Sequence, residues 1–440
     1  MSDSNPMSSN DFASSVNKES AINKVSSSNL LSAASVDSLC IGKPRFDKMP
    51  MLLAIMIIAT GQVGVSIYLP ALPAISESLS VSQAQIQLLV TLFLVGFGLS
   101  QLFYGPLSDA IGRRPVFLFG QGIYLVGTAV CYAFSDQLAW LEFGRLLQGL
   151  GAGSASVLGR SVLRDSYEGA QFTKALSYLS ITASIIPILS PVIGGAIAFY
   201  FGWQAVFGFV LIYLASIFFV GWKILPETLP YGKKRFKAIT VMKNYGCLLV
   251  NPQVISSASY NWFTYLAAVV SVSILPFILQ NQLGLSVAEY GLVMIIPSAG
   301  LLAGSITLNI LTRYYSVSRL LMASFVLIAL SGVWLVVMPF TLFNVIFAFT
   351  WLTVAQGLSF PLSIRLLISP HKFQAGAVSA LSGSIQMALA GLVGGYLIKT
   401  WVTNHYQLGV FFLAISLMLG AVLYLSCKYS WNGEPQKTQP

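Results

Sequence analysis

A compact charged group lies between two long apolar segments of the chain, within residues 105–115. Its members are Gly105, Asp109, Gly112, Arg113 and Arg114. Charges this close to a bilayer persist only at a water interface or inside a protein network. Asp109 ends an apolar helix, so its charge opposes the negative end of the helix dipole and needs a partner, namely Arg113, Arg114 or the N-terminus of another helix. We expect such a network to hold one conformation until it breaks. A plain turn with basic anchors would explain the arginines but not Asp109.

Arg145 is the one base deep within a predicted apolar span, where a cation costs roughly 2.5–3.5 kcal/mol. Glu142 lies one turn earlier on the same helix face, so a local ion pair is available. We expect Glu142 to take up and release a proton while Arg145 stabilises its charged form. A static, partly hydrated pair is the alternative, and Asp109 and Asp165 are alternative proton carriers.

These residues need membrane helices to position them. Hydrophobic residues form 56% of the 440 residues and charged residues only 9%, with a mean hydropathy of +0.77, which excludes an ordinary soluble domain. Twelve apolar segments are long enough, at about 20 residues, to cross the ~30 Å hydrocarbon layer. The sequence therefore predicts an all-α membrane protein with spans at 50–72, 85–107, 115–134, 139–161, 172–199, 203–225, 253–281, 288–311, 318–339, 343–368, 374–400 and 407–428.

The positions of the basic residues predict the topology. All but two of the 24 Lys and Arg residues, Arg145 and Lys399, fall on one side of the predicted spans. By the positive-inside rule, both termini and the connector are cytoplasmic. The net charge of +10 therefore reflects membrane insertion, and we expect no nucleic acid partner. The predicted parts are a disordered tail (1–48), a six-helix bundle (49–225), a connector (226–251), a second six-helix bundle (252–428) and a second tail (429–440).

Three short matches in the same order indicate that the two bundles are parallel repeats. Leu-Pro recurs at 69–70 and 275–276, Gln-Gly-Leu at 148–150 and 356–358, and Gly-Gly at 194–195 and 394–395. In such repeats a substrate binds near the bilayer midplane, between halves that rock.

Metal and catalytic clusters are not predicted. The four cysteines have neither disulfide context nor metal-ligand spacing, and His371 and His405 fall in loops. We therefore expect no metal and no cofactor, and the absence of a catalytic constellation disfavours a membrane-embedded enzyme.

Several of these motifs resemble those of the major facilitator superfamily. The charged group, Gly105-x-x-x-Asp109-x-x-Gly112-Arg113-Arg114, resembles the superfamily's loop signature between helices 2 and 3. Leu141-x-x-x-Arg145-x-x-Gln148-Gly149-x-Gly151 resembles its helix 4 motif. The prolines and glycines of Pro187-x-x-x-Pro191-x-x-Gly194-Gly195 resemble the helix 5 motif of its drug:proton antiporters, with Ser190 where Gly is usual.

Two further segments resemble the bicyclomycin and chloramphenicol resistance (Bcr/CflA) group, which includes EmrD-like exporters. They are Tyr68-Leu69-Pro70-Ala71-Leu72-Pro73 and Leu225-Pro226-Glu227-Thr228-Leu229-Pro230. The resemblance implies a monomeric, proton-driven multidrug exporter of a bacterial inner membrane, with amphiphilic drugs, protons and membrane lipid as its partners. Ser66 departs from the group's pattern, in which many members carry an Asp. Export of a specific sugar or amino acid is the alternative.

Candidate substrate contacts are polar and aromatic residues within the predicted spans. An apolar, aromatic cavity with few fixed polar groups would accept many drug-sized molecules. The candidates are Gln62, Ser66, Tyr68, Phe93, Tyr265, Gln280, Trp351, Gln356 and Gln386. Lipid contact or core packing is the alternative for each aromatic residue.

Overall fold

The computed structural model describes residues 48–229 and 238–429, and every regular element in these ranges is helical. The predicted tails lie almost entirely outside the described residues, as do residues 230–237 of the connector. The first half contains α2 (Met49–Ser66), η1 (Leu69–Ala71), α3 (Leu72–Ser78), α4 (Gln83–Ile111), α5 (Arg113–Ala133), α6 (Leu138–Ser166), α7 (Gly169–Phe201) and α8 (Gln204–Ile224).

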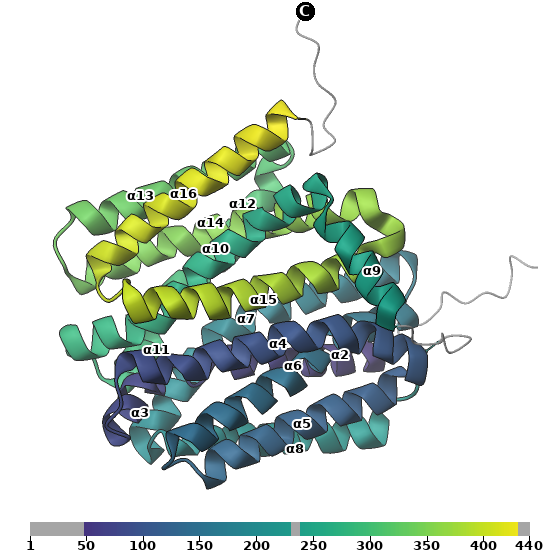
Figure 1. Ribbon diagram of the computed structural model, residues 1–440, viewed down its shortest axis with the longest axis horizontal. Coiled ribbons are helices and arrows are strands. Elements are labelled where there is room, and N and C mark those ends of the chain that lie inside the picture. Colours follow the sequence, from purple (N-terminus) through teal and green to yellow (C-terminus); the bar gives the residue numbers. More distant parts are fainter. Residues whose placement is uncertain (1–47, 230–237, 430–440) are drawn as a thin grey trace, which may run out of the picture. The chain divides into compact units, whose positions relative to one another are not determined.

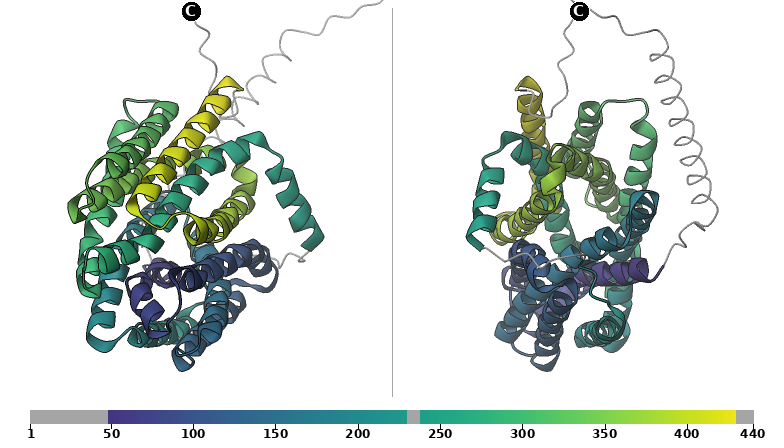
Figure 2. Two further views of the ribbon diagram at one scale, coloured as in Figure 1. Left: turned by 60° about the vertical axis from the view of Figure 1, so that its left-hand side comes forward. Right: turned by 90° about the vertical axis from the view of Figure 1, so that its right-hand side faces the viewer.

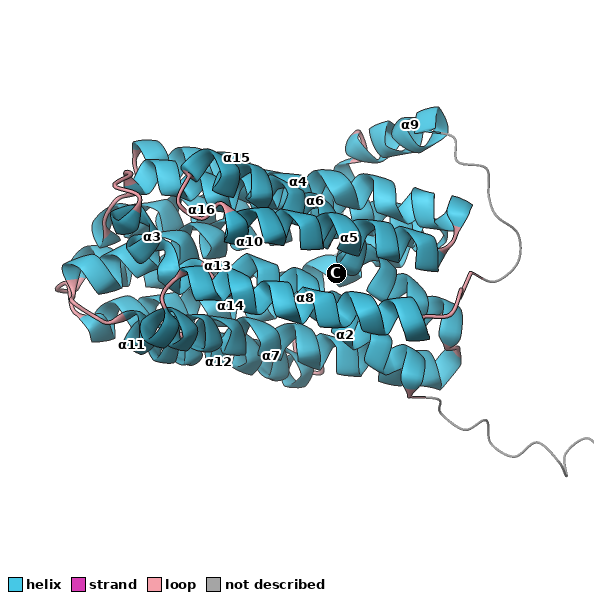
Figure 3. Cartoon of the chain, turned by 90° about the horizontal axis from the view of Figure 1, so that it is seen from below, coloured by secondary structure: helices cyan, strands magenta, loops and turns pink. Residues whose placement is uncertain are grey.

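A short connector helix, α9 (Ala238–Leu249), precedes the second half. The second half contains α10 (Pro252–Pro276), η2 (Phe277–Gln282), α11 (Val287–Val293), α12 (Ile295–Leu311), α13 (Val317–Val337), α14 (Leu342–Ile368), η3 (Ser369–Gln374), α15 (Ala375–Thr400) and α16 (His405–Lys428). Figures 1 and 2 show the helices of each half gathered together. In Figure 3 most of the long helices run along a common direction.

Ten helical segments in the described ranges are long and apolar enough to cross a membrane. The other two crossings are α6, which has 29 residues and carries Arg145, and α7, which contributes the apolar stretch Ile185–Phe201. Counting α2 to α3, α10 with η2, and α11 with α12 as single crossings gives twelve. The predicted all-α fold of twelve transmembrane helices is confirmed.

Equivalent positions in the two halves begin and break their helices in the same way. Ser82 and Ser286 each form a capping box at the start of the second crossing of their half, with Gln85 and Glu289 respectively. The first crossing of each half is interrupted at its Leu-Pro pair, which lies within η1 in the first half and directly before η2 in the second. Gln280 Nε2 in η2 donates to the Pro70 carbonyl in η1, 2.8 Å away, and so joins the two breaks. We call this end of the bundle the η1 end.

The Gly-Gly pairs of α7 and α15 make matching contacts. A Cβ on Gly194 would collide with the Ile67 carbonyl, beside α2, and one on Gly394 would lie 3.3 Å from Leu266 of α10, so the first glycine packs on the first crossing of its own half. The second glycine faces the other half. A Cβ on Gly195 would lie 2.7 Å from the Val287 carbonyl of α11, and one on Gly395 would collide with Thr91 of α4. The predicted parallel repeat is therefore present in the packing.

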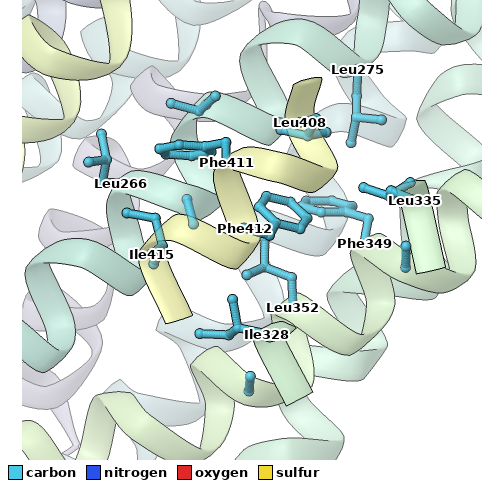
Figure 4. Close-up of a cluster of buried hydrophobic side chains, with 14 of the residues drawn as sticks. Leu266, Leu275, Ile328, Leu335, Phe349, Leu352, Leu408, Phe411, Phe412 and Ile415 are labelled. Atoms are coloured by element: carbon cyan, nitrogen blue, oxygen red, sulfur yellow. The ribbon is translucent and has the colours of Figure 1, made fainter. Parts of the chain in front are cut away.

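Two apolar cores stabilise the bundle. The core of the second half contains the residues of Figure 4, among them Phe349, Phe411 and Phe412. The core of the first half is completed by three side chains from the second, Val269, Phe277 and Ala390. Because burying apolar surface has no water-driven benefit against lipid, close packing through small residues must supply much of the helix association.

The connector helix α9 contacts both halves. Tyr245 and Leu248 pack in a cluster with Trp262 of α10 and Leu381 of α15. The Tyr245 hydroxyl also donates to the Leu102 carbonyl of α4, 3.1 Å away. Pro106 has no N–H to bond this carbonyl, so Tyr245 supplies the missing donor. Burial raises the pKa of Tyr245, which keeps the phenol protonated as that donor.

Candidate functional site

Arg145 is the centre of a buried polar network in the first half. Its side chain is 2% exposed and lies between two rings, with Cζ 3.8 Å from the ring centroid of Tyr68 and 4.2 Å from that of Phe93. Nε donates to the Leu89 carbonyl and Nη2 to the Gly64 carbonyl, both at 3.2 Å. The guanidinium thereby ties α6 to α2 and α4, and its cation–π contacts offset part of the burial cost.

The amide of Gln148 extends this network toward α5. Gln148 Oε1 accepts a hydrogen bond from Arg145 Nη1, and Gln148 Nε2 donates to the Thr128 hydroxyl, 2.9 Å away. Thr128 in turn donates to the Tyr124 carbonyl at 2.9 Å. A continuous polar chain therefore runs from α2 through α6 to α5 inside an otherwise apolar bundle.

The prediction of an ion pair between Glu142 and Arg145 is wrong. Arg113 and Arg164 form ion pairs with acidic residues, whereas Arg145 forms none within the described residues. Glu142 is partly exposed near the start of α6, one turn from Arg145. The Arg145 side chain instead reaches main-chain carbonyls of neighbouring helices, so sharing a helix face did not bring the two charges together.

Arg113 is the centre of a second network, at the opposite end of the bundle from η1. Arg113 Nη1 pairs with Asp109 at 2.6 Å, as one of the expected partnerships, and also donates to the Ser108 hydroxyl. Arg113 Nε pairs with Asp165 of α6 at 2.8 Å. The side chains of Arg113 and Asp165 are 3% and 5% exposed, whereas that of Asp109 is 42% exposed. The buried partner of this arginine is therefore Asp165.

Glu227, just after α8, caps the first turn of α5. Its carboxylate accepts from the backbone N–H of Arg113 at 2.7 Å and of Arg114 at 3.3 Å. An anion at this position is stabilised by the helix dipole and by the unpaired N–H groups. Arg114 Nη2 returns the contact by donating to the Trp222 carbonyl, 2.7 Å away, in the last turn of α8.

The whole Arg113 network lies within the first half of the chain. It fixes the ends of α4, α5, α6 and α8 to one another. At this end, the halves meet through α9 and through a hydrogen bond from Arg160 of α6 to Ser379 of α15, 3.2 Å long. The network therefore sets the position of α4, which packs along α15 of the other half.

Gly112 is required at the α4–α5 junction for two separate reasons. Its φ of +116° is a conformation that residues with a Cβ rarely adopt. An added Cβ would also lie 2.9 Å from Glu227 Cδ and collide with Glu227 Oε2, so it would displace the cap. Gly105 differs, because a Cβ there would meet Val157 at 3.7 Å, an ordinary contact. A side chain at Gly105 could therefore be accommodated without moving the neighbouring helix.

We expect Gly112→Ala to lower the unfolding temperature more than Gly202→Ala does. Gly202 is a matched control, since its φ is +85° but an added Cβ would come no nearer than 3.4 Å to the Gln204 side chain. Both changes introduce backbone strain of about 1–3 kcal/mol, and only the first displaces a charged cap worth about 1 kcal/mol. Thermal unfolding of the purified variants measures the difference; equal shifts would show that Glu227 is not displaced.

The predicted substrate contacts fall into several groups. Tyr68 and Phe93 hold Arg145, and Tyr265 packs against the same buried cluster from the second half. Gln62 and Ser66 are partly buried on α2, where Ser66 donates to the Gln62 carbonyl at 3.0 Å.

The remaining candidates lie in the second half. Gln280 bonds Pro70, as described, and Gln356 is partly buried on α14. Trp351 packs in tilted contact with Trp334 of α13 and with Phe347, along a face of α14 that continues to the exposed Phe343. Trp351 therefore belongs to an outward-facing aromatic cluster, apart from the other candidates.

A buried polar pair that sequence reasoning missed lies between α10 and α15. Asn261 Nδ2 donates to Gln386 Oε1, 2.7 Å away, and Asn261 is 5% exposed. Nearby, the Trp262 indole donates to Ser382. Gln386 was identified from its type, but Asn261 lies in a Ser-rich stretch that has no motif to single it out.

The prolines of the predicted antiporter motif lie in one uninterrupted helix. Pro187 is partly buried and Pro191 is buried, and α7 continues through both to Phe201. A Cβ on Gly291 of α11 would lie 2.7 Å from the Pro191 carbonyl. Together with Gly195, this places the motif at the seam between the halves.

Twelve membrane-length helices in two packed repeats, with a buried arginine network in the first, define a multi-pass membrane carrier. The chain belongs to the Major Facilitator Superfamily, whose sequence model matches residues 52–271. It is 28% identical to Multidrug resistance protein D of Escherichia coli (strain K12) over 405 residues, which are 88% of this chain and 98% of that protein. It is 26% identical over 356 residues to Multidrug resistance protein MdtL of Escherichia coli O81 (strain ED1a), covering 81% and 88%.

Solved structures share the fold at low identity. A bacterial homolog of the human lysosomal transporter Spinster, inward-facing and unoccupied, matches with a TM-score of 0.70 and 14% identity, covering 90% of this chain and 100% of that one. A D-xylose–proton symporter matches with a TM-score of 0.64 and 12% identity, covering 84% and 96%. Both of these transporters therefore share the fold of this chain.

Proposed function

We propose that this chain exports amphiphilic, drug-like molecules across a bacterial inner membrane in exchange for protons. The observation that carries the proposal is the full-length likeness to Multidrug resistance protein D, which extends over 98% of that protein. The apolar and aromatic character of the core supports it, because such surfaces bind varied amphiphiles by burial and stacking.

In this proposal the Arg113 end faces the cytoplasm, as do both termini, and the η1 end faces the periplasm. The placement of Lys and Arg residues supports this orientation. Contacts between the halves then act as gates, with Gln280 on Pro70 at one end and Arg160 on Ser379 at the other. The two gates open in turn as the halves rock. The carrier works as a monomer, surrounded by lipid, with the proton gradient as its energy source and no cofactor.

Proton coupling would depend on Glu142 and on the Arg145 network near it. Glu142 is a carboxylate at the η1 end, partly exposed and therefore reachable by protons from the periplasm. Asp165 is the alternative carrier, since it is buried beside Arg113 at the other end. This arrangement supports a route for protons, with an acid near each face of the membrane and the fixed cation Arg145 between them.

We expect drug addition to drive proton movement in proteoliposomes that hold the purified protein and an imposed pH gradient. Chloramphenicol or a lipophilic dye serves as the substrate and an internal pH dye as the readout. Glu142→Gln should abolish the drug-evoked flux, while Asp136→Asn, an exposed acid in the loop before α6, should leave it unchanged. Absence of flux from wild-type protein that still binds drug would overturn proton exchange, and wild-type flux in Glu142→Gln would exclude Glu142 as the proton carrier.

Export of one polar metabolite is the second candidate, favoured by the buried Asn261–Gln386 pair. A substrate recognised by such a pair loses much affinity when its hydrogen-bonding groups are removed. Counterflow assays with sugars, with amino acids and with hydrophobic dyes distinguish the two functions. Saturable counterflow of a single polar solute would support the second.

A further inference from the structure

The charge of Arg145 has no counter-charge among the described residues. The side chain is 2% exposed, and it forms no ion pair within the described part of the chain. Its hydrogen-bond acceptors are two main-chain carbonyls and one amide, all neutral. A buried charge is costly unless an opposite charge is close, so these contacts orient the guanidinium without neutralising it.

A small pocket lies directly beside this cation. It is lined by Gly64, Ile67, Tyr68, Arg145, Gln148, Val206, Phe207 and Val210. The lining combines Gly64 of α2, the two residues between α2 and η1, and two residues of α6 with three apolar side chains of α8. It contains no acidic residue, so Arg145 supplies its only formal charge.

A second group beside the pocket also lacks a partner. Tyr68 is 2% exposed, and its hydroxyl has no hydrogen-bond partner within the part of the chain that the structure describes. A phenol O–H left without an acceptor costs about 1–3 kcal/mol when buried. The guanidinium of Arg145 also has N–H groups beyond the three that are used. The pocket therefore contains a cation and an unused hydrogen-bond donor, and its lining supplies no negative charge to pair with them.

We propose that this pocket binds one small monovalent anion of the size of chloride, held by Arg145 and the Tyr68 hydroxyl. The anion supplies the missing counter-charge and accepts the orphaned O–H. The apolar wall from Val206, Phe207 and Val210 favours a compact, weakly hydrated anion over a large, strongly hydrated one such as sulfate. A water molecule would satisfy Tyr68 but would leave the charge uncompensated.

The test is the binding of radiolabelled chloride to the purified full-length protein in detergent. We expect saturable binding of about one ion per chain, displaced by bromide but not by gluconate or sulfate. At constant ionic strength, saturating chloride should raise the unfolding temperature by about 2 °C or more relative to gluconate, because a ligand of the folded state stabilises it. Displacement of the label by small organic acids such as formate would show that carboxylates share the site.

Three variants make the assignment specific. Gln148→Glu places a carboxylate of the same shape on Arg145 Nη1, so chloride binding and the thermal shift should disappear. Tyr68→Phe keeps the ring against Arg145 and removes only the hydroxyl, so affinity should fall at least tenfold. Tyr104→Phe alters a buried tyrosine outside the pocket and should bind like the wild type. No saturable binding to wild-type protein, or unchanged binding in Tyr68→Phe, would overturn the proposal whether or not Gln148→Glu folds. Because the readout is binding, the result does not depend on the proposed transport function.

Discussion

Asp165→Asn is expected to lower the free energy of unfolding by about 3–5 kcal/mol, because it leaves the buried Arg113 without its buried counter-charge. The pair is 2.8 Å long and both side chains are at most 5% exposed. Since the Arg113 side chain fixes the ends of α4, α5 and α6 to one another, transport should fall at least tenfold as well. Chemical or thermal unfolding in detergent, together with dye efflux from cells, measures both effects.

The same arginine supplies a matched control. Asp109 pairs with Arg113 at 2.6 Å, but its side chain is 42% exposed. Exposed pairs contribute about 0–1 kcal/mol, so Asp109→Asn should change stability little. A loss of stability in Asp109→Asn that equals the loss in Asp165→Asn would contradict the assignment of Asp165 as the principal partner.

Arg145→Ala is expected to reduce transport about a hundredfold or more, because it removes three hydrogen bonds and leaves a cavity between two rings. Lost buried contacts of this kind cost about 3–5 kcal/mol, and each 1.4 kcal/mol is a factor of about ten in an equilibrium. Arg145→Lys keeps the charge but cannot reach three acceptors in fixed directions, so it should fail nearly as badly.

Arg160→Ala on the same helix is a control for stability only, because its contact with Ser379 is one of the two proposed gates. Arg160 is exposed and donates a hydrogen bond to the Ser379 hydroxyl, 3.2 Å away. We expect this variant to be as stable as the wild type. Efflux by Arg145→Lys at the wild-type rate, in protein of equal yield, would show that charge alone is needed at this position.

Periodicity and length in the sequence were enough to predict the twelve crossings, because each crossing must satisfy its own backbone inside lipid. The parallel repeat followed from three dipeptide and tripeptide matches, and the packing roles of the two Gly-Gly pairs agree. The Asp109–Arg113 contact was also predictable, since four residues separate the charges. Each of these features can be recognised from short stretches of sequence.

The contacts of Arg145 could not be predicted in the same way. Its acceptors are carbonyls of Gly64 and Leu89, and a main-chain carbonyl is present at every position, whatever the residue. Glu142 satisfied the spacing rule, but a long arginine side chain has several directions available, and tertiary contacts select among them. Spacing on one helix therefore predicts that two charged side chains can reach each other, but not that they form an ion pair.

Glu227 and Trp351 illustrate two further limits. Glu227 acts on α5 from 114 residues away, so its motif was visible in the sequence but its partner was not. Trp351 was selected by residue type, and only the structure shows it packed against Trp334 on α13. Which side of a transmembrane helix faces a cavity depends on neighbours from the whole chain.

The seam at the glycine pairs also has an energetic consequence. At Gly195, Gly291 and Gly98 the halves approach through backbone atoms, with an added Cβ only 2.7 Å from a carbonyl across the seam. Such surfaces hold by many weak dispersion contacts and few directional bonds. Sliding one half over the other exchanges one set of weak contacts for a similar set, so the barrier of the working cycle stays low. A weakly bound substrate can then shift the balance between the two conformations, so transport does not require high substrate affinity.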